Sequence, residues 1–289
     1  MLEKLFKGFL FILSLMSIFL LGFVILYIVM EALPLFREVG LNDFLFSSKW
    51  APTGITGAKS FGIFNFIMAS IFVSVCAMLI AVGFSLGCAI YLAFIAKSRL
   101  RSLLYAGIDL LAGIPSVIYG FIGMSVIVRS FAKLKAGTGH SVLSAALLLS
   151  IMLLPYMISS FTETLIKARI KYLESAEVLG MSKWYVIVSL IIPVSAKFLL
   201  GSMVLAIGRA MGETMAVMML MGNANLFPKL LGKAESIASL IALEMGAAVG
   251  ESLHYHALYA AALVLMSALL LINILIYFIR DKMIKSEIL

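Results

Sequence analysis

Two stretches of this chain, residues 8–30 and 257–279, each run for 23 residues without a charged side chain. An α-helix rises about 1.5 Å per residue, so about 20 apolar residues cross a hydrocarbon layer about 30 Å thick. Both stretches are long enough and apolar enough to span a membrane. We therefore expect a transmembrane helix near each end of the chain.

Composition excludes an ordinary soluble globular protein. Of the 289 residues, 63% are hydrophobic and 12% are charged, and the mean hydropathy is +1.15. A soluble domain needs far more polar surface than this. Four further apolar segments complete a predicted all-α integral membrane protein with six transmembrane helices. These segments lie at about residues 64–96, 102–128, 141–164 and 186–221.

Helix-disrupting residues occur in three of the six predicted helices. They are Gly113-Ile114-Pro115 in the third, Pro155 in the fourth and Pro193 early in the fifth. We expect kinks there, because proline lacks a backbone N–H donor and the freed groups need partners inside the protein. Such breaks either line a transport pathway or serve close packing, for which membrane helices commonly use glycine and proline. The sequence leaves both alternatives open.

The distribution of lysine and arginine favours a cytoplasmic N-terminus and a cytoplasmic C-terminus. With that orientation, inner segments near the helix ends hold twelve of these residues and outer loops hold eight, which follows the positive-inside rule. The net charge of +8 is then explained by orientation and by anionic lipid headgroups. We expect no nucleic-acid partner, since no basic run is interleaved with exposed aromatic residues.

No metal site is predicted. Cys76 and Cys88 lie about 18 Å apart along one predicted helix, too far for a disulfide, so we interpret them as packing residues. We interpret His254 and His256 as interfacial anchors, because no cysteine or carboxylate cluster accompanies them. The scattered methionines suit adaptable packing better than a copper pathway.

The loop between the fourth and fifth predicted helices, residues 167–184, has helical periodicity. Lys171, Glu174 and Glu177 lie off one helical face, and we expect Gly180 to end the helix or permit a tight turn. The residues that share the face recur at i, i+3, i+7 and i+11, and they are Leu173, Ala176, Gly180 and Trp184. A short amphipathic helix is predicted. Periodicity alone also permits a helix that simply lies on the lipid surface.

The motif in this loop is more specific than its periodicity. Glu174-Ser175-Ala176, Gly180 and Leu190-Ile191-Ile192-Pro193 together resemble the EAA loop of ABC importer permeases. That loop usually reads Glu-Ala-Ala, Gly and Ile-x-Leu-Pro, so Ser175, Leu190 and Ile192 depart from it. The resemblance implies a type I ABC importer (MetI-like) transmembrane domain. Its coupling helix, near residues 168–185, would dock into a groove of an ATPase.

The ATPase itself is expected to be another chain. ATP hydrolysis of this kind needs a phosphate-cradling loop of the form Gly-x4-Gly-Lys-[Ser/Thr], and the sequence contains none. We therefore expect ATP and Mg²⁺ on the partner ATPase, with no cofactor and no catalytic residue on this chain.

Two opposite charges, Arg209 and Glu213, lie in the fifth predicted helix. At a spacing of four residues they share a helical face and can pair. Either Glu213 only neutralises Arg209, or the two serve transport, since a charge at the bilayer centre costs about 3 kcal/mol or more. The planar guanidinium group also matches an oxyanion. Asp109, in the inner part of the third predicted helix, is likewise open to two interpretations, pairing with a basic group or gating.

A second resemblance covers nearly the whole chain from about Trp50 onward. Arg209-Ala210-Met211-Gly212-Glu213-Thr214-Met215-Ala216-Val217, followed by Gly222-Asn223, resembles the signature of PstC-type phosphate ABC transporter permeases. Residues 111–120 are similar to another block of that family. Trp50-Ala51-Pro52 and Phe61-Gly62-Ile63 are similar to its first external loop. The Gly-Thr pair that the family carries at the start of its second helix is absent.

This resemblance implies phosphate uptake across a prokaryotic plasma membrane. The partners would be a second permease subunit of the PstA type, two copies of a PstB-type ATPase and an external phosphate-binding protein of the PstS type. Arg209, Glu213 and Thr214 would face the path of phosphate. Ser116 and Tyr119, at the break in the third helix, either donate hydroxyl groups to the same anion or serve helix packing.

Three parts of the chain are predicted. Residues 1–60 form the first helix and an external loop, residues 61–280 form the importer core, and residues 281–289 form a cytoplasmic tail. The external stretch 223–256, which contains the uncharged segment 236–243, is expected to form a short re-entrant or surface helix that receives the binding protein. The alternative functions are a permease for another oxyanion, such as molybdate or sulfate, and an ion-coupled secondary transporter. The EAA-like loop argues against the secondary transporter.

Overall fold

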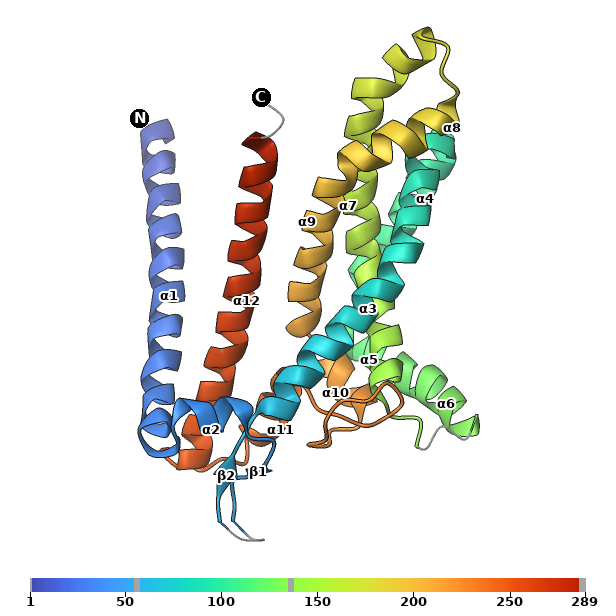
Figure 1. The fold of residues 1–289 in the computed structure, drawn as a ribbon. Coiled ribbons are helices and arrows are strands. Elements are labelled where there is room, and N and C mark those ends of the chain that lie inside the picture. The colour runs from blue at the N-terminus through green and yellow to red at the C-terminus, as the bar shows by residue number, and fades with distance from the viewer. Residues whose placement is uncertain (1, 55–57, 135–137, 286–289) are drawn as a thin grey trace. The chain divides into compact units, whose positions relative to one another are not determined.

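The computed structural model describes residues 2–54, 58–134 and 138–285, and this part of the chain is almost entirely helical (Figure 1). It divides into two compact units. One comprises Met1–Phe64 with Leu240–Met266, and the other comprises Asn65–Ser239 with Ser267–Leu289. Of the predicted tail, residues 281–285 continue the last helix, and residues 286–289 lie outside the described residues.

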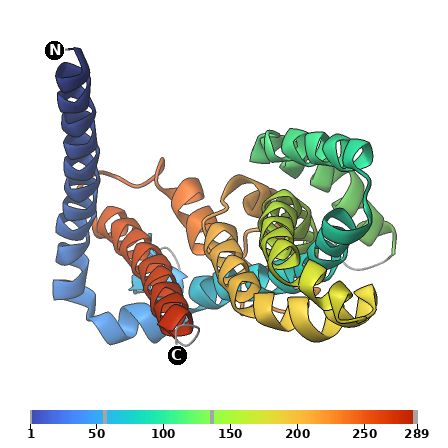
Figure 2. The ribbon, with the colours of Figure 1, turned by 90° about the horizontal axis from the view of Figure 1, so that it is seen from above.

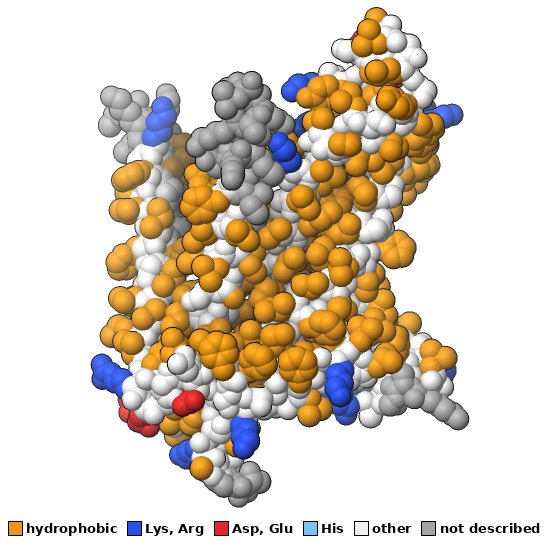
Figure 3. All heavy atoms as spheres, in the orientation of Figure 1, with side chains coloured by type: hydrophobic (Ala, Val, Ile, Leu, Met, Phe, Trp, Pro, Cys, Tyr) orange, Lys and Arg blue, Asp and Glu red, His pale blue; other side chains and the backbone are white. Residues whose placement is uncertain are grey.

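Six helices in the described part are long and apolar enough to cross a membrane, which confirms the predicted number. They are Phe6–Val39, Phe64–Ile95, Ser116–Lys133, Val142–Val178, Lys183–Met211 and Leu253–Leu275. On the face seen in Figure 3, hydrophobic side chains cover the long helices, and lysine and arginine gather toward helix ends. That distribution suits a bilayer around the helices, because charged groups then stay near water.

The first unit combines long helices with a small strand pair. It contains α1 (Leu2–Val39), α2 (Leu41–Phe46), most of α11 (Ile237–Glu244) and the first half of α12 (Leu253–Lys285). Strands β1 (Trp50–Ala51) and β2 (Ser60–Phe61) pair antiparallel, with Trp50 opposite Phe61. A short helix within the stretch 223–256 is present as α11.

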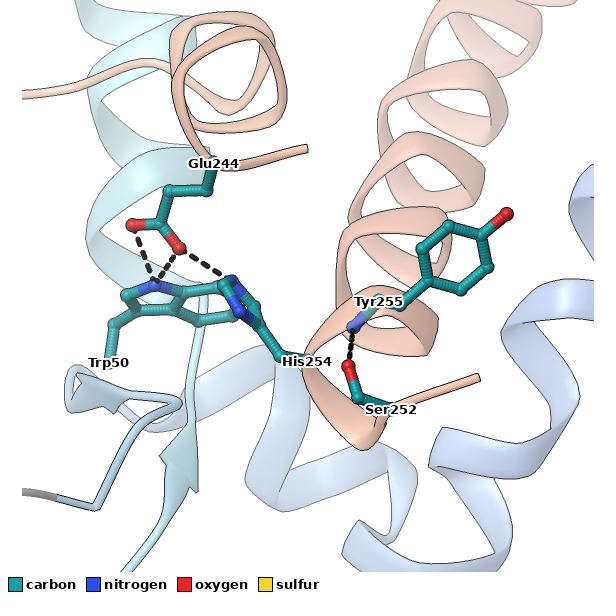
Figure 4. Close-up of polar contacts among 5 residues, drawn as sticks. All are labelled: Trp50, Glu244, Ser252, His254 and Tyr255. Atoms are coloured by element: carbon teal, nitrogen blue, oxygen red, sulfur yellow. Dashed lines mark hydrogen bonds and ion pairs between the residues drawn. The ribbon is translucent and has the colours of Figure 1, made fainter. Parts of the chain in front are cut away.

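A polar network in this unit joins β1, α11 and α12 (Figure 4). The indole nitrogen of Trp50 donates to both carboxylate oxygens of Glu244, at 3.1 and 3.0 Å. His254 Nε2 lies 2.7 Å from Glu244 Oε2. In a second pair, His256 Nδ1 lies 3.4 Å from the carboxylate of Glu31 on α1. The interpretation of these histidines as interfacial anchors missed their carboxylate partners, which are distant in sequence.

The second unit holds the remaining helices. They are α3 (Phe64–Ile90), α4 (Ser98–Ala112), α5 (Ser116–Gly123), α6 (Arg129–Lys133), α7 (Val142–Val178), α8 (Lys183–Val186), α9 (Ile192–Met211) and α10 (Met215–Met221), with π-helical turns η1 (Tyr91–Ile95), η2 (Met124–Val128) and η3 (Ile187–Ile191). The long α7 is the centre of this unit and packs against α4, α5, α9 and α10. Figures 1 and 2 both show α9 beside α7.

The predicted helix breaks have three different outcomes. The third predicted helix is two helices, because α4 ends at Ala112 and α5 begins at Ser116, after Pro115. The fourth, α7, continues through Pro155. Pro193 lies inside the continuous helical run Lys183–Met211, where the π-helical turn η3 directly precedes it and accommodates its missing N–H. Proline therefore ends a helix here only where glycine accompanies it.

Glycine allows α5 to pack closely on its neighbours. A Cβ atom placed on Gly123 would lie 2.8 Å from Leu220 Cδ2 of α10 and 2.9 Å from Leu148 Cδ2 of α7. Membrane helices gain much of their association energy from such small-residue contacts.

Replacing Gly123 with leucine is expected to destabilise the second unit by about 1–3 kcal/mol, because the added side chain overfills a packed interface. The measurement is the thermal unfolding midpoint of the purified protein in detergent. Gly107→Leu on α4 is the matched control, since no atom lies within 4 Å of its Cβ position. Equal midpoints for the two variants would contradict the packing argument.

Candidate functional site

Arg209 lies in the last turn of α9, on the exposed surface of the second unit. Its side chain lines a cavity of about 230 Å³. Three other helices complete the wall. Helix α4 contributes Asp109, α5 contributes Tyr119, and α7 contributes Tyr156 and Ser159. The cavity therefore gathers a guanidinium group, a carboxylate and three hydroxyl groups from four helices.

The predicted pairing of Arg209 with Glu213 on one helical face is wrong. Helix α9 ends at Met211, and Gly212 and Glu213 lie in the break before α10. The Glu213 carboxylate accepts the backbone N–H of Ala216 at 3.3 Å and so caps the first turn of α10. Among the described residues, no hydrogen bond or ion pair joins Arg209 to Glu213. The i, i+4 rule fails because the helix does not continue between them.

The other predicted site residues have different surroundings. Thr214 is partly exposed, and its hydroxyl donates to the Gly212 carbonyl at 3.4 Å. Tyr119 is 7% exposed and donates to the Leu111 carbonyl at 2.9 Å, across the α4–α5 break. That bond supports the packing role for its hydroxyl, although the side chain still lines the cavity. Ser116 begins α5 and is absent from the cavity wall.

Two wall residues, Tyr156 and Ser159, were missed in the sequence. Both follow Pro155 on α7, and Pro155 is itself part of the wall. The signal in the sequence is Pro155, because Tyr156 and Ser159 are the polar residues that follow this helix-disrupting residue within one turn. Asp109 shares the cavity with Arg209, yet within the described residues no ion pair links the two side chains. Its second interpretation, gating, remains a prediction.

The predicted short coupling helix is instead the end of α7, which carries Glu174, Ser175 and Ala176 as far as Val178. Leu173 and Ala176 are buried at 7% and 4% exposure, as the periodicity predicts. Trp184 is not on their face, because it belongs to α8 and is 57% exposed.

Gly180 ends α7 as predicted. Its φ of 76° is left-handed, and the backbone N–H of the next residue, Met181, donates to the Ala176 carbonyl at 3.1 Å. Glycine adopts this conformation without the steric cost that a Cβ atom brings. Pro193, thirteen residues later, lies in the first turn of α9 and outside this turn.

The α7–α8 turn carries an apolar surface beside its charges. Glu174 and Ser175 are exposed. Five large apolar residues there are 44% to 85% exposed, and they are Val178, Leu179, Met181, Trp184 and Tyr185. We call these five residues the turn surface. A contiguous exposed apolar patch of this kind is typical of a surface that binds another protein.

Basic residues from both sides of the turn hold the end of the second membrane helix. Arg169 of α7 donates to the Ala93 carbonyl at 2.6 Å, and Lys183 of α8 donates to the Phe94 carbonyl at 2.7 Å. These carbonyls belong to η1, where a helix end leaves acceptors unsatisfied and a partial negative charge. The cations therefore connect the turn to the helix that precedes α4.

Replacing Arg169 with leucine is expected to lower the stability of the second unit by about 1.5–3 kcal/mol, the range for a hydrogen bond from a charged group. The thermal unfolding midpoint of the purified protein measures the change. Arg99→Leu is the control. Arg99 is an exposed residue of α4, and its replacement removes the same charge from a segment next to η1. A midpoint no lower than that of the control would show that the Ala93 contact contributes nothing.

Comparisons with known proteins agree on one family. Residues 83–285 match the model of the family described as binding-protein-dependent transport system inner membrane component. The probable ABC transporter permease protein YqgH of Bacillus subtilis (strain 168) is 33% identical over 242 residues, covering 83% of this chain and 78% of that protein. The phosphate transport system permease protein PstC of Xylella fastidiosa (strain 9a5c) is 36% identical over 251 residues, covering 80% of this chain and 74% of that protein.

A solved structure supports the fold. An inward-facing conformation of the MetNI methionine ABC transporter superposes with a TM-score of 0.60, covering 76% of this chain and 95% of that chain. Sequence identity is 12%, so the likeness concerns the fold alone.

Proposed function

Since the chain belongs to the family of binding-protein-dependent transport system inner membrane components, we propose that it is the PstC-type permease subunit of an ATP-driven phosphate importer. The family and the six apolar helices make it a multi-pass inner membrane protein with the MetI-like fold of type I ABC importers. Phosphate as the cargo is supported by relatives that bear the name PstC and by the chemistry around Arg209.

The observation that carries the proposal is the exposed position of Arg209 at the end of a membrane-spanning helix. A charge facing lipid at the bilayer centre costs about 3 kcal/mol or more, whereas a charge facing a water-filled path avoids most of that cost. The guanidinium group can bind a phosphate oxygen pair through two parallel hydrogen bonds. Arg209 therefore attracts phosphate to the 230 Å³ cavity, where the hydroxyl groups of Tyr156 and Ser159 are further donors.

Carboxylates in and near this cavity limit how tightly phosphate is held. Asp109 lines the same cavity and Glu213 lies four residues beyond Arg209. Their negative charges repel an oxyanion, which keeps the site from trapping its cargo. This division of roles suits a transporter, which must release what it binds.

Coupling to ATP takes place through the α7–α8 turn. Glu174, Ser175 and Ala176 at the end of α7, with the turn surface beyond Gly180, would dock into a groove of a PstB-type ATPase that binds ATP and Mg²⁺. Arg169 and Lys183 would pass the movement of that turn to η1. Two ATPase copies, a PstA-type permease and a PstS-type external binding protein complete the complex, with both termini of this chain in the cytoplasm.

The test is ATP-dependent uptake of radiolabelled phosphate into proteoliposomes that contain this chain with its companion permease, ATPase and binding protein. Arsenate is expected to block uptake, sulfate and molybdate to spare it, and omission of the ATPase to abolish it. Transport of sulfate or molybdate instead of phosphate would keep the architecture and overturn the cargo. Uptake without the ATPase would contradict the importer itself.

A further inference from the structure

A second cavity, of about 490 Å³, lies between α7 and α9. Tyr156 lines both this cavity and the one that holds Arg209, so the two cavities are neighbours that share one side chain. From Tyr156 the second cavity extends toward the α7–α8 turn, because its lining runs from Tyr156 to Tyr172 along α7 and from Leu205 back to Val194 along α9. No role was assigned to it from the sequence.

Hydroxyl groups from both helices line this cavity. Ser160 and Thr164 follow Tyr156 at intervals of four residues and so share its face of α7. Across the cavity, α9 contributes Ser195 and Ser202. The Ser160 and Ser202 hydroxyl oxygens lie 2.7 Å apart, and Ser202 also donates to the Phe198 carbonyl at 3.1 Å. Ser160 therefore holds the proton shared by the pair, and that proton can turn to a ligand.

Ser195 is the second, independent observation that points to a ligand. Its side chain is 2% exposed, lines the cavity, and has no hydrogen-bond partner for its Oγ among the described residues. A buried hydroxyl without a partner is unfavourable, because it has lost water and gained nothing in exchange. An acceptor in the cavity would satisfy it.

The charges around the cavity favour an anion. Lys167 and Lys171 lie on its wall toward the α7–α8 turn, with one carboxylate, Glu163. Glu163 is already bound by Lys167 at 2.7 Å. The wall thus carries two lysines and one carboxylate beside the hydroxyl groups of Ser160, Thr164, Ser195 and Ser202, of which Thr164 already donates to the Ser160 carbonyl at 2.9 Å. An oxyanion needs donors and positive charge, and the volume is enough for one with several waters, each of which occupies about 30 Å³ in the liquid.

We propose that this cavity is a second oxyanion site, which phosphate enters after it leaves Arg209 and passes Tyr156 on its way toward the α7–α8 turn. This inference rests on the proposed function for the direction of travel and for phosphate as the occupant. Tyr156 is then the barrier between an outer site built on arginine and an inner site built on serine and lysine. Weak hydroxyl donors suit the inner site, because the anion must leave it.

The first test is transport. In proteoliposomes with the complete complex, Ser195→Ala and the double variant Ser160→Ala/Ser202→Ala are each expected to slow ATP-dependent phosphate uptake at least threefold. Ser150→Ala is the matched control, because Ser150 is a buried serine of α7 that bonds its own helix at Leu147 and does not line the cavity. Uptake by the cavity variants equal to that of Ser150→Ala would overturn the proposal.

The second test measures occupancy and does not depend on transport. Ser195→Cys, in a complex whose permease lacks Cys76 and Cys88, is labelled with an anionic thiosulfonate reagent in phosphatidylcholine vesicles. Free phosphate is expected to slow labelling at least threefold relative to chloride at equal ionic strength. Equal rates in phosphate and chloride would overturn the proposal.

One further arm separates free phosphate from a lipid headgroup. Vesicles that contain phosphatidic acid, without added phosphate, are expected to leave the labelling rate unchanged. Protection by that lipid alone would assign the cavity to a headgroup and overturn its place on the path. If the wild-type complex fails to take up phosphate, the proposed function is wrong. The labelling experiment still shows whether phosphate occupies the second cavity.

Discussion

Replacing Arg209 with glutamine is expected to lower ATP-dependent phosphate uptake by the assembled complex about 10- to 100-fold. Arg209 is the exposed cation of the 230 Å³ cavity, and glutamine keeps a similar length while it removes the charge and the two-pronged donor geometry. A hydrogen bond to a charged group is worth about 1.5–3 kcal/mol, and each 1.4 kcal/mol corresponds to about a factor of ten. The measurement is the initial rate of radiolabelled phosphate uptake into proteoliposomes.

Two controls make the Arg209 result specific. Arg209→Lys keeps the charge without the planar fork, so its uptake is expected to fall between wild type and Arg209→Gln. Arg129→Gln removes an exposed arginine from α6, away from the cavity, and is expected to leave uptake unchanged. Co-purification of the companion subunits checks assembly. Uptake by an assembled Arg209→Gln complex within twofold of wild type would falsify the proposed role of this side chain.

Reversing the charge at Glu174 is expected to separate this permease from its ATPase. Glu174 is exposed near the end of α7, beside the apolar turn surface. In a docked interface, Glu174→Lys places a cation where a carboxylate meets basic groups, and like charges at an interface cost several kcal/mol. We expect the ATPase to be lost from the purified complex, and phosphate uptake to fall at least tenfold.

The control for Glu174→Lys is Asp43→Lys, which makes the same change of net charge at an exposed carboxylate of α2. The ATPase is expected to co-purify with that variant as with wild type. Retention of the ATPase and of phosphate-stimulated ATP hydrolysis by Glu174→Lys would show that the end of α7 is not the docking element. Loss of the ATPase from both the Glu174→Lys and the Asp43→Lys complexes would point to a general effect of charge.

Long-range contacts account for most of what the sequence did not predict. The Arg169 and Lys183 contacts with η1 join residues 76 and 89 positions apart, and the partners of Trp50 and His256 are 194 and 225 positions away. Periodicity describes only neighbours within a few turns, so no pattern in the sequence connects such residues. The motif analysis recognised Arg209 and Glu174, yet it could not show what surrounds them.

The sequence by itself determined the number of spanning helices, the left-handed end of α7 at Gly180 and the family, because hydropathy, glycine conformation and motif spacing are local properties. Tertiary structure alone decided that α9 stops before Glu213, that this carboxylate caps α10 rather than pairing with Arg209, and that Tyr156 lines two cavities. Whether a helix continues past a Gly-Glu-Thr segment depends on what its two halves pack against. The packing energy comes from contacts of α10 with α5 and α7, which are distant in sequence, so no single stretch of the chain predicts it.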